Sequence, residues 1–209
     1  MKMETEHQAV IIGNGDFPTS PFALKVLNEA TYVVCCDGGA NEYIRKGYVP
    51  DAIVGDGDSL ADDIKQQHKE IIHYNPCQET NDQTKAVNFL IEKGFKNITI
   101  IGATGKREDH TLGNISLLVD YMRMGVNIRT YTDYGTFTPC HDTQQFSSFA
   151  HQQVSIFNIS ATHLSSVGLQ YPIYDFNNWW QGTLNEATTS SFTIEAQGDY
   201  IVFTTYEKK

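Results

Sequence analysis

Acidic side chains recur in this sequence where short apolar runs end. Asp56 and Asp58 flank one glycine in "GDGDS", directly after the run "AIVG", and Asp37 follows the run "TYVVCC". Asp82 opens the stretch "DQTKAVNFLIEKG". If these carboxylates share one place, they repel each other unless a cation lies among them. Residues two apart in an extended chain point the same way, so Asp56 and Asp58 can address one cation, and Gly57 leaves room for it.

The candidate ligands are all oxygens, which favours magnesium over zinc. Magnesium usually binds through one or two carboxylates together with the phosphates of a substrate. The histidines and cysteines show no spacing typical of zinc ligands. We therefore predict a magnesium site among Asp37, Asp56, Asp58 and Asp82.

A cationic loop, "GATGKREDH", supplies the opposite charge. Two glycines keep its backbone open, Lys106 and Arg107 are cationic, and a helix is expected close behind. Backbone N–H groups at a helix start and an arginine fork suit a polyphosphate, although neither a Walker A loop nor a GxGxxG fingerprint is present. Asp109 either caps the helix or holds Arg107 by an ion pair. The predicted nucleotide-binding residues are Asp37, Gly102, Thr104, Gly105, Lys106 and Arg107.

Each of these features also has a plain structural explanation. "GDGDS" can be an Asx-type turn that caps a helix beginning near Leu60, Asp82 can cap the helix that follows it, and Asp37 can begin a turn. Lys106 and Arg107 can be solvated loop residues. A shared location favours a site, because each segment follows a predicted strand, and open parallel sheets bind ligands beyond the carboxyl ends of their strands.

The elements that must position these residues come from the hydrophobic pattern. In the first two thirds of the chain, short apolar runs alternate with amphipathic stretches of helical length, which is typical of a parallel sheet flanked by helices. Residues 82–94 and 110–125 are predicted helices, each ending at a glycine. The second helix is expected to share one apolar face among Leu112, Ile115, Leu118, Val119 and Met122. The predicted strands are "AVIIG", "TYVVCC", "AIVG", "IIHY", "NITIIG" and "NIRTYT".

The pattern changes after about Tyr134, where short alternating runs such as "VSIFNIS" and "SFTIEA" take over. "EAQGDYIVF" is expected to form two strands joined by a Gly-Asp turn, and "FNNWWQGTLNEATTS" a polar loop. The predicted fold is therefore α/β: an N-terminal, Rossmann-like domain with a parallel sheet, residues 1–135, followed by a C-terminal all-β sandwich domain, residues 136–209.

Composition excludes two classes of partner. The formal charge is −10 and the acidic residues are dispersed, whereas proteins that bind nucleic acid normally show a basic stripe. No apolar stretch is long enough to span a bilayer, and "MKMETEHQAV" lacks the apolar core of a signal peptide. We expect a soluble, cytoplasmic protein without nucleic-acid or membrane partners.

Four motifs in one order, "CCDGGAN", "DAIVGDGDS", "NDQTKAV" and "GATGKREDHTLGNI", precede a β-rich tail that contains "GTLNEA". Together they resemble the thiamine pyrophosphokinase family over nearly the whole chain. The resemblance implies a catalytic, nucleotide-binding α/β domain, a C-terminal β-sandwich for thiamine binding and dimerisation, and a homodimer with substrate sites between subunits. It also implies that the pyrophosphoryl group of ATP moves to the hydroxyl of thiamine with magnesium, giving thiamine diphosphate and AMP.

The resemblance assigns roles to individual residues. Asp56 and Asp58 match the carboxylates of the family's GDxDS motif, and Asp82 matches the acid of its TDxT/TDxxxA motif. The resemblance therefore implies that Asp56, Asp58 and Asp82 are the ligands of the magnesium ion. Arg107 and Asp109 match the family's GRxDH pair, which completes the predicted catalytic set. Asp82 is also our candidate to accept the proton of the thiamine hydroxyl. The predicted substrate-binding residues are Gln78, Asn81, Asp82, Thr183, Leu184 and Asn185, of which the last three lie in a segment similar to the family's GTSNE.

Three positions depart from the family pattern. Gly57 replaces a bulky, often aromatic residue, Asn81 replaces a threonine, and Leu184 replaces a serine whose hydroxyl is expected to bond in the thiamine pocket. These departures leave open a thiamine- or nucleotide-binding protein without catalysis. Because the carboxylates indicate polyphosphate chemistry but not the acceptor, a magnesium-dependent kinase or nucleotidyl transferase for another small alcohol also stays open. Trp179 and Trp180 are expected either to stack on a cationic heterocycle or to make packing or dimer contacts.

Overall fold

The structure is a computed structural model that describes residues 8–208. These residues form two compact units, which divide between Asp133 and Tyr134. Each unit has a hydrophobic core of its own. Among the described residues, no helix combines the length and the apolar character needed to cross a membrane.

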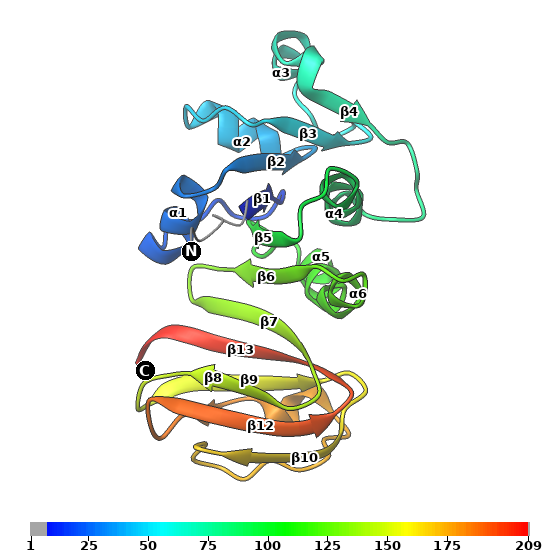
Figure 1. Cartoon of the computed structure of the whole chain (residues 1–209). Helices are drawn as coiled ribbons and strands as arrows, with labels where there is room; N and C mark the ends of the chain where they lie inside the picture. Colours follow the sequence, from blue (N-terminus) through cyan, green and yellow to red (C-terminus); the bar gives the residue numbers. More distant parts are fainter. Residues whose placement is uncertain (1–7, 209) are drawn as a thin grey trace, which may run out of the picture. The chain divides into compact units, whose positions relative to one another are not determined.

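A six-stranded parallel sheet forms the centre of the first unit, in the order β4-β3-β2-β1-β5-β6 (Figure 1). All six predicted strands are confirmed. Strand order reverses between β1 and β5, and open α/β sheets bind ligands at such a reversal. The strands are β1 (Gln8–Ile12), β2 (Tyr32–Cys36), β3 (Ala52–Gly55), β4 (Ile72–Tyr74), β5 (Asn97–Ile101) and β6 (Asn127–Tyr131).

Helices cover both faces of this sheet (Figure 1). Leu27 of α1, Tyr43 of α2 and Ile64 of α3 pack in one cluster with Cys35 of β2. On the other face, α4 contacts β1, β2 and β3. Two of these helices, α1 and α2, are not among the predicted ones. The helical elements are α1 (Pro21–Asn28), α2 (Gly39–Arg45), α3 (Asp62–Gln67), η1 (Lys69–Ile71), α4 (Asp82–Glu92), α5 (Glu108–Ser116) and α6 (Leu118–Arg123).

The predicted helix over residues 110–125 is wrong in its continuity and in its buried face. The chain forms α5 and α6, which meet at Leu117. α5 buries none of its residues, and Leu112 is exposed, whereas α6 buries Leu118 and Val119. The stretch before Leu117 contains Gly113 and three short polar residues, which are poor helix formers, so its apolar spacing alone does not bring it onto the sheet.

The second unit consists of two antiparallel sheets, in the orders β11-β9-β13-β7 and β10-β12-β8. β12 and β13 are the two predicted strands around the Gly-Asp turn, and the chain passes from one sheet to the other at this turn. The elements are β7 (Gly135–His141), β8 (Gln144–Ser147), β9 (Gln152–Asn158), β10 (Thr162–Val167), η2 (Trp179–Gly182), β11 (Asn185–Glu186), β12 (Ser191–Gln197) and β13 (Asp199–Lys208).

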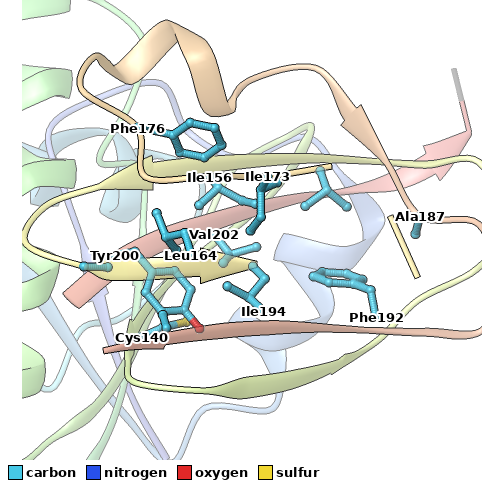
Figure 2. Close-up of a cluster of buried hydrophobic side chains, with 13 residues drawn as sticks. Cys140, Ile156, Leu164, Ile173, Phe176, Ala187, Phe192, Ile194, Tyr200 and Val202 are labelled. Carbon is cyan, nitrogen blue, oxygen red and sulfur yellow. The ribbon is translucent and has the colours of Figure 1, made fainter. Parts of the chain in front are cut away.

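Side chains from both sheets meet in the core of the second unit (Figure 2). Ile156 and Val202 come from the first sheet, and Phe192 and Ile194 from the second. The fully buried Tyr200 satisfies its hydroxyl by donating to the carbonyl oxygen of Asp142, at 2.9 Å. Burial alternates along β9 and β12, and the two sheets enclose one core, which confirms the predicted β-sandwich.

Candidate functional site

The carboxyl ends of β1 and β5 carry loops that hydrogen bond to each other. The backbone N–H of Gly15 donates to Gly102 at 2.7 Å, and that of Asp16 donates to Thr104 at 2.9 Å. Two predicted nucleotide-binding residues, Gly102 and Thr104, therefore lie beside the loop that follows β1. Both loops lie where strand order reverses, at the edge of the sheet where open α/β sheets bind ligands.

Three aspartates meet at this edge, and we call them the aspartate cluster. Asp37 follows β2, Asp56 follows β3, and Asp82 is the first residue of α4. One carboxylate oxygen from each lies within 4.8 Å of the other two. Asp58 is exposed and is not part of this cluster, so its assignment as a metal ligand stays a prediction.

Asp37 is the buried member of the aspartate cluster, with 3% of its surface exposed. Its Oδ2 accepts the backbone N–H of Ser59 at 2.8 Å, but its Oδ1 has no hydrogen-bond partner. Burial raises the pKa of Asp37, and the nearby charges of Asp82 and Asp56 raise it further, against the hydrogen bond from Ser59. A buried carboxylate oxygen without a partner is costly, and a cation among these three carboxylates would satisfy it.

Asp56 has its carboxylate fixed by two donors. The backbone N–H of Asp58 donates to Oδ1 at 3.2 Å, and the amide of Gln78 donates to Oδ2 at 3.1 Å. These two hydrogen bonds, that of Asp58 first, lower the pKa of Asp56. The Asx-type turn considered for "GDGDS" is therefore present. It does not cap a helix, because the next helix, α3, begins at Asp62 after the N-cap Ala61 and has no side-chain cap.

Asp82 pairs with a buried lysine, Lys85, which was not among the predicted site residues. The ammonium of Lys85 lies 2.9 Å from Oδ1 of Asp82, and the lysine side chain is only 4% exposed. Burial acts to lower the pKa of Lys85, but the hydrogen bond and charge of Asp82, with the charge of Asp56, outweigh burial and raise it. The signal available in the sequence was the i, i+3 spacing of the two residues at a helix start.

Asn81 is the N-cap of α4, so the alternative that Asp82 caps this helix is wrong. The side-chain oxygen of Asn81 accepts the backbone N–H of Thr84 at 2.9 Å. Its amide donates to Asn114 of α5 at 3.0 Å, and Asn114 donates to the carbonyl of Ala103 at 2.9 Å. Asparagine in place of the family's threonine thus preserves the cap and also links α4 to the loop after β5.

Gly57 keeps a conformation that other residues rarely adopt, with φ of +83°. A β-carbon at this position would lie 2.8 Å from the ring of Tyr74, at the end of β4. The space beside Gly57 is thus already filled by an aromatic ring from a neighbouring strand. This explains structurally why the loop tolerates a glycine where the family has a bulky residue.

The cationic loop holds its charges toward the same edge. Lys106 donates to the backbone oxygen of Asn14 at 3.0 Å, and Arg107 forms a two-point ion pair with Asp109. The hydrogen bond from Arg107 is the main reason that the pKa of Asp109 falls to about 2. Arg107 itself is the N-cap of α5, so of the two explanations for Asp109 the ion pair is confirmed and the helix cap is wrong.

A pocket of about 430 Å³ opens in front of the aspartate cluster. A second pocket, of about 200 Å³, lies against the cationic loop, and Asn14, His110 and Asn114 line both. Asn14 and Asn114 were not among the predicted site residues. "GNGD" after the first strand was the available signal for Asn14. The predicted site residues that line one or other pocket are Asp56, Gln78, Asn81, Asp82, Gly105, Lys106 and Arg107.

Three predicted substrate-binding residues belong to the second unit. Thr183 donates its hydroxyl to the carbonyl of Trp180 at 2.7 Å, and Leu184 is 75% exposed with φ of +63°. Asn185 is buried. Its side-chain oxygen accepts the backbone N–H of Tyr171, and its side-chain amide donates to the carbonyl oxygen of Tyr171. Asn185 therefore fixes the loop that carries Thr183 and Leu184.

The two tryptophans of this loop differ in exposure. Trp179 packs edge-on against Phe157 with a centroid distance of 5.7 Å and remains 41% exposed, while Trp180 is 73% exposed. The packing explanation therefore applies to Trp179, and Trp180 is free to meet a ligand or a partner.

The fold and this site define a class: a parallel-sheet domain with three clustered aspartates at its ligand edge, followed by a β-sandwich domain. Comparison with known proteins gives the particular family. The model of "Thiamin pyrophosphokinase, catalytic domain" matches residues 23–130, and that of "Thiamin pyrophosphokinase, substrate-binding domain" matches residues 135–203. Because the first match alone spans more than half of the 209 residues, the chain belongs to the thiamin pyrophosphokinase family.

Curated relatives agree with this family. Thiamine pyrophosphokinase 1 of Oryza sativa subsp. japonica is 31% identical over 143 residues, which cover 56% of this chain and 53% of the relative. Thiamin pyrophosphokinase 1 of Caenorhabditis elegans is 34% identical over 104 residues, covering 46% and 42%. The chain thus spans about half the length of these relatives. The thiamine pyrophosphokinase of Bacillus subtilis is 25% identical and is covered over 80% of its length, with 78% of this chain.

Solved structures show the same fold. The thiamine pyrophosphokinase of Bacillus subtilis superposes with a TM-score of 0.80 at 22% identity, covering 95% of this chain and 98% of that one. The thiamin pyrophosphokinase of Candida albicans gives 0.79 at 19% identity, covering 97% and 90%.

Proposed function

We propose that this protein transfers the pyrophosphoryl group of ATP to the hydroxyl of thiamine and so makes thiamine diphosphate and AMP. The observation that carries the proposal is the aspartate cluster. Three carboxylates from three segments converge within 4.8 Å, and one of their buried oxygens has no partner. In a chain of the thiamin pyrophosphokinase family, such a cluster fits the binding of the metal that accompanies ATP.

Magnesium is the proposed ion, with Asp37, Asp56 and Asp82 as its holders and Asp58 beside them. The donors are all carboxylate oxygens, and magnesium prefers oxygen ligands. When bound, the ion would neutralise charge on the phosphates during transfer. The chain itself keeps the aspartates in place, through the N–H of Ser59 on Asp37 and the donors on Asp56.

The polyphosphate is proposed to lie along the loop after β5. Lys106 and Arg107 bring two positive charges to this loop, and Asp109 holds the arginine fork in one orientation. Phosphoryl-type transfer depends mainly on positioning and on charge neutralisation, so no covalent nucleophile is needed. Gly102, Thr104 and Gly105 complete the proposed nucleotide site.

Thiamine is proposed to meet Gln78, Asn81 and Asp82, because all three line the larger pocket beside the aspartate cluster. Thr183 and Leu184 of the second unit are proposed as further thiamine contacts, since Asn185 holds their loop in shape. Asp82 is the proposed acceptor of the hydroxyl proton.

A homodimer with substrate sites between subunits, and a cytoplasmic location, are further parts of the proposal. Exposed apolar side chains of the second unit support dimerisation, since such groups mark interaction surfaces when they gather. They include Tyr171, Tyr174, Trp180 and Leu184. The buried thiols of Cys35 and Cys36 fit a reducing compartment.

Phosphorus NMR of the protein with ATP, magnesium and thiamine tests the reaction. We expect signals of AMP and thiamine diphosphate, and we expect Asp56→Asn to remove them. Asp62→Asn is the matched control, because it removes an exposed carboxylate outside the aspartate cluster. Formation of ADP and thiamine monophosphate would instead show that the protein transfers a single phosphoryl group, as a simple kinase does. Thiamine binding with unchanged ATP would favour a binding protein without catalysis.

A further inference from the structure

Lys85 places a positive charge inside the aspartate cluster. Its ammonium contacts Oδ1 of Asp82 at 2.9 Å, and only 4% of its side chain is exposed. Its charge also interacts with Asp56. Burying an ammonium is costly unless it is well paired, so a lysine at this place must offset that cost by a specific interaction.

The pairing leaves the cluster with a charge that suits one divalent ion. With all three carboxylates ionised and Lys85 protonated, these four groups would carry a net charge of −2. Lys85 occupies one oxygen of Asp82, while Oδ1 of Asp37 keeps no partner. The aspartate cluster therefore offers a fixed set of oxygens to a cation. Lys85 already reduces part of the repulsion among the three carboxylates.

We propose that Lys85 is a positioning residue that sets the metal affinity of the aspartate cluster. By holding Asp82 and contributing one positive charge, it keeps the three carboxylates close without metal and weakens the binding of a divalent ion enough for release after each turnover. The effect on turnover rests on the proposed function, whereas the effect on metal binding rests on the cluster alone.

Binding of Mn²⁺ to the full chain, followed by electron paramagnetic resonance without thiamine or ATP, tests this. Lys85→Met removes the charge and keeps an unbranched apolar stem. Because this change removes a positive charge that would repel a divalent ion in the aspartate cluster, we expect the Kd for Mn²⁺ to fall at least about tenfold. Lys85→Arg should stay near the wild-type Kd, as should Lys93→Met, an exposed lysine of the same helix region.

Measurements of turnover distinguish the positioning role of Lys85 from a loss of folded protein. We expect kcat of Lys85→Met to fall although it binds Mn²⁺ more tightly, and Lys85→Arg to recover part of kcat. Weaker or unchanged Mn²⁺ binding in Lys85→Met would overturn the proposal, and so would wild-type protein that binds no Mn²⁺. If Lys85→Met does not fold, Lys85→Gln gives the same comparison. Wild-type protein that binds Mn²⁺ but makes no thiamine diphosphate would refute the proposed reaction and leave the affinity comparison valid.

Discussion

Asp37 illustrates how one residue can favour ligand binding at the expense of stability. Its Oδ1 is buried without a partner, and burial with two neighbouring carboxylates raises its pKa. We predict that Asp37→Asn raises the free energy of unfolding of the metal-free protein by roughly 1 kcal/mol, because the buried charge disappears and the new amide can donate to the neighbouring carboxylates. The same change should lower turnover at least about tenfold, because one carboxylate oxygen of the proposed metal site is replaced by an amide nitrogen.

Thermal unfolding with and without Mg²⁺ measures both effects of Asp37→Asn. Wild-type protein should gain stability on adding Mg²⁺, and the variant should gain less. A variant that is less stable than wild type without metal, or equally stabilised by it, would contradict this account of Asp37. Asp62→Asn serves again as the control.

The ion pair of Arg107 and Asp109 gives a prediction about pH. Because Arg107 lowers the pKa of Asp109 to about 2, Asp109 binds its proton less readily in the folded protein than in the unfolded chain, where about 3.9 is expected. The pair therefore adds stability above about pH 4, and this contribution is lost as pH falls toward 2. We predict that Arg107→Gln returns the pKa of Asp109 toward 3.9 and lowers kcat/KM. Carboxyl-carbon NMR of Asp109 checks the first part, and an unchanged pKa would show that Arg107 does not hold it.

Single residues of the site were predictable to different degrees. Asp56 and Asp82 follow predicted strands or open a helix, so their position at the sheet edge came from the sequence pattern. Lys85 could not be found that way, because an acid and a base three apart usually form an exposed surface pair, and only the packing of α4 shows that this one is buried. Equally, the pattern could not tell that Asp37, and not Asp58, would complete the aspartate cluster, since that depends on how each turn bends.

At the scale of elements, α4 is the helix on which the site depends. Asn81 caps it and links it to α5, and Asp82 stands in its first turn. We predict that Asn81→Ala lowers the free energy of unfolding by about 1 kcal/mol, the usual value of a helix cap, and that turnover falls with it because Asp82 loses its anchor. Chemical denaturation measures the stability. Asn81→Thr restores the family's residue and the cap, so it should recover stability; if it does not, the link to Asn114 matters more than the cap.

Two helices, α1 and α2, were not predicted, and α5 was predicted with the wrong buried face. Strands buried on both faces are continuous apolar runs and were all found, whereas α1 and α2 are short helices of 8 and 7 residues. α5 carries apolar spacing without being buried, because it stands at the rim of the sheet, where Leu112 meets solvent. Hydrophobic periodicity indicates which residues can share a face, but only the three-dimensional arrangement decides whether that face is covered.

At the scale of the whole molecule, the second unit leaves large apolar side chains exposed, among them Trp180 and Leu184. We predict that the wild-type protein sediments at roughly twice the chain mass of 23.5 kDa. A charged group on such a surface would oppose contact between two copies, so the double variant Trp180→Glu, Leu184→Glu should sediment as a monomer. Val49→Glu, at an exposed residue of the first unit, is the control and should remain dimeric. Analytical ultracentrifugation over a range of concentrations measures this. A monomeric wild type would refute the proposed dimer, and a double variant that stays dimeric would place its contact on another surface.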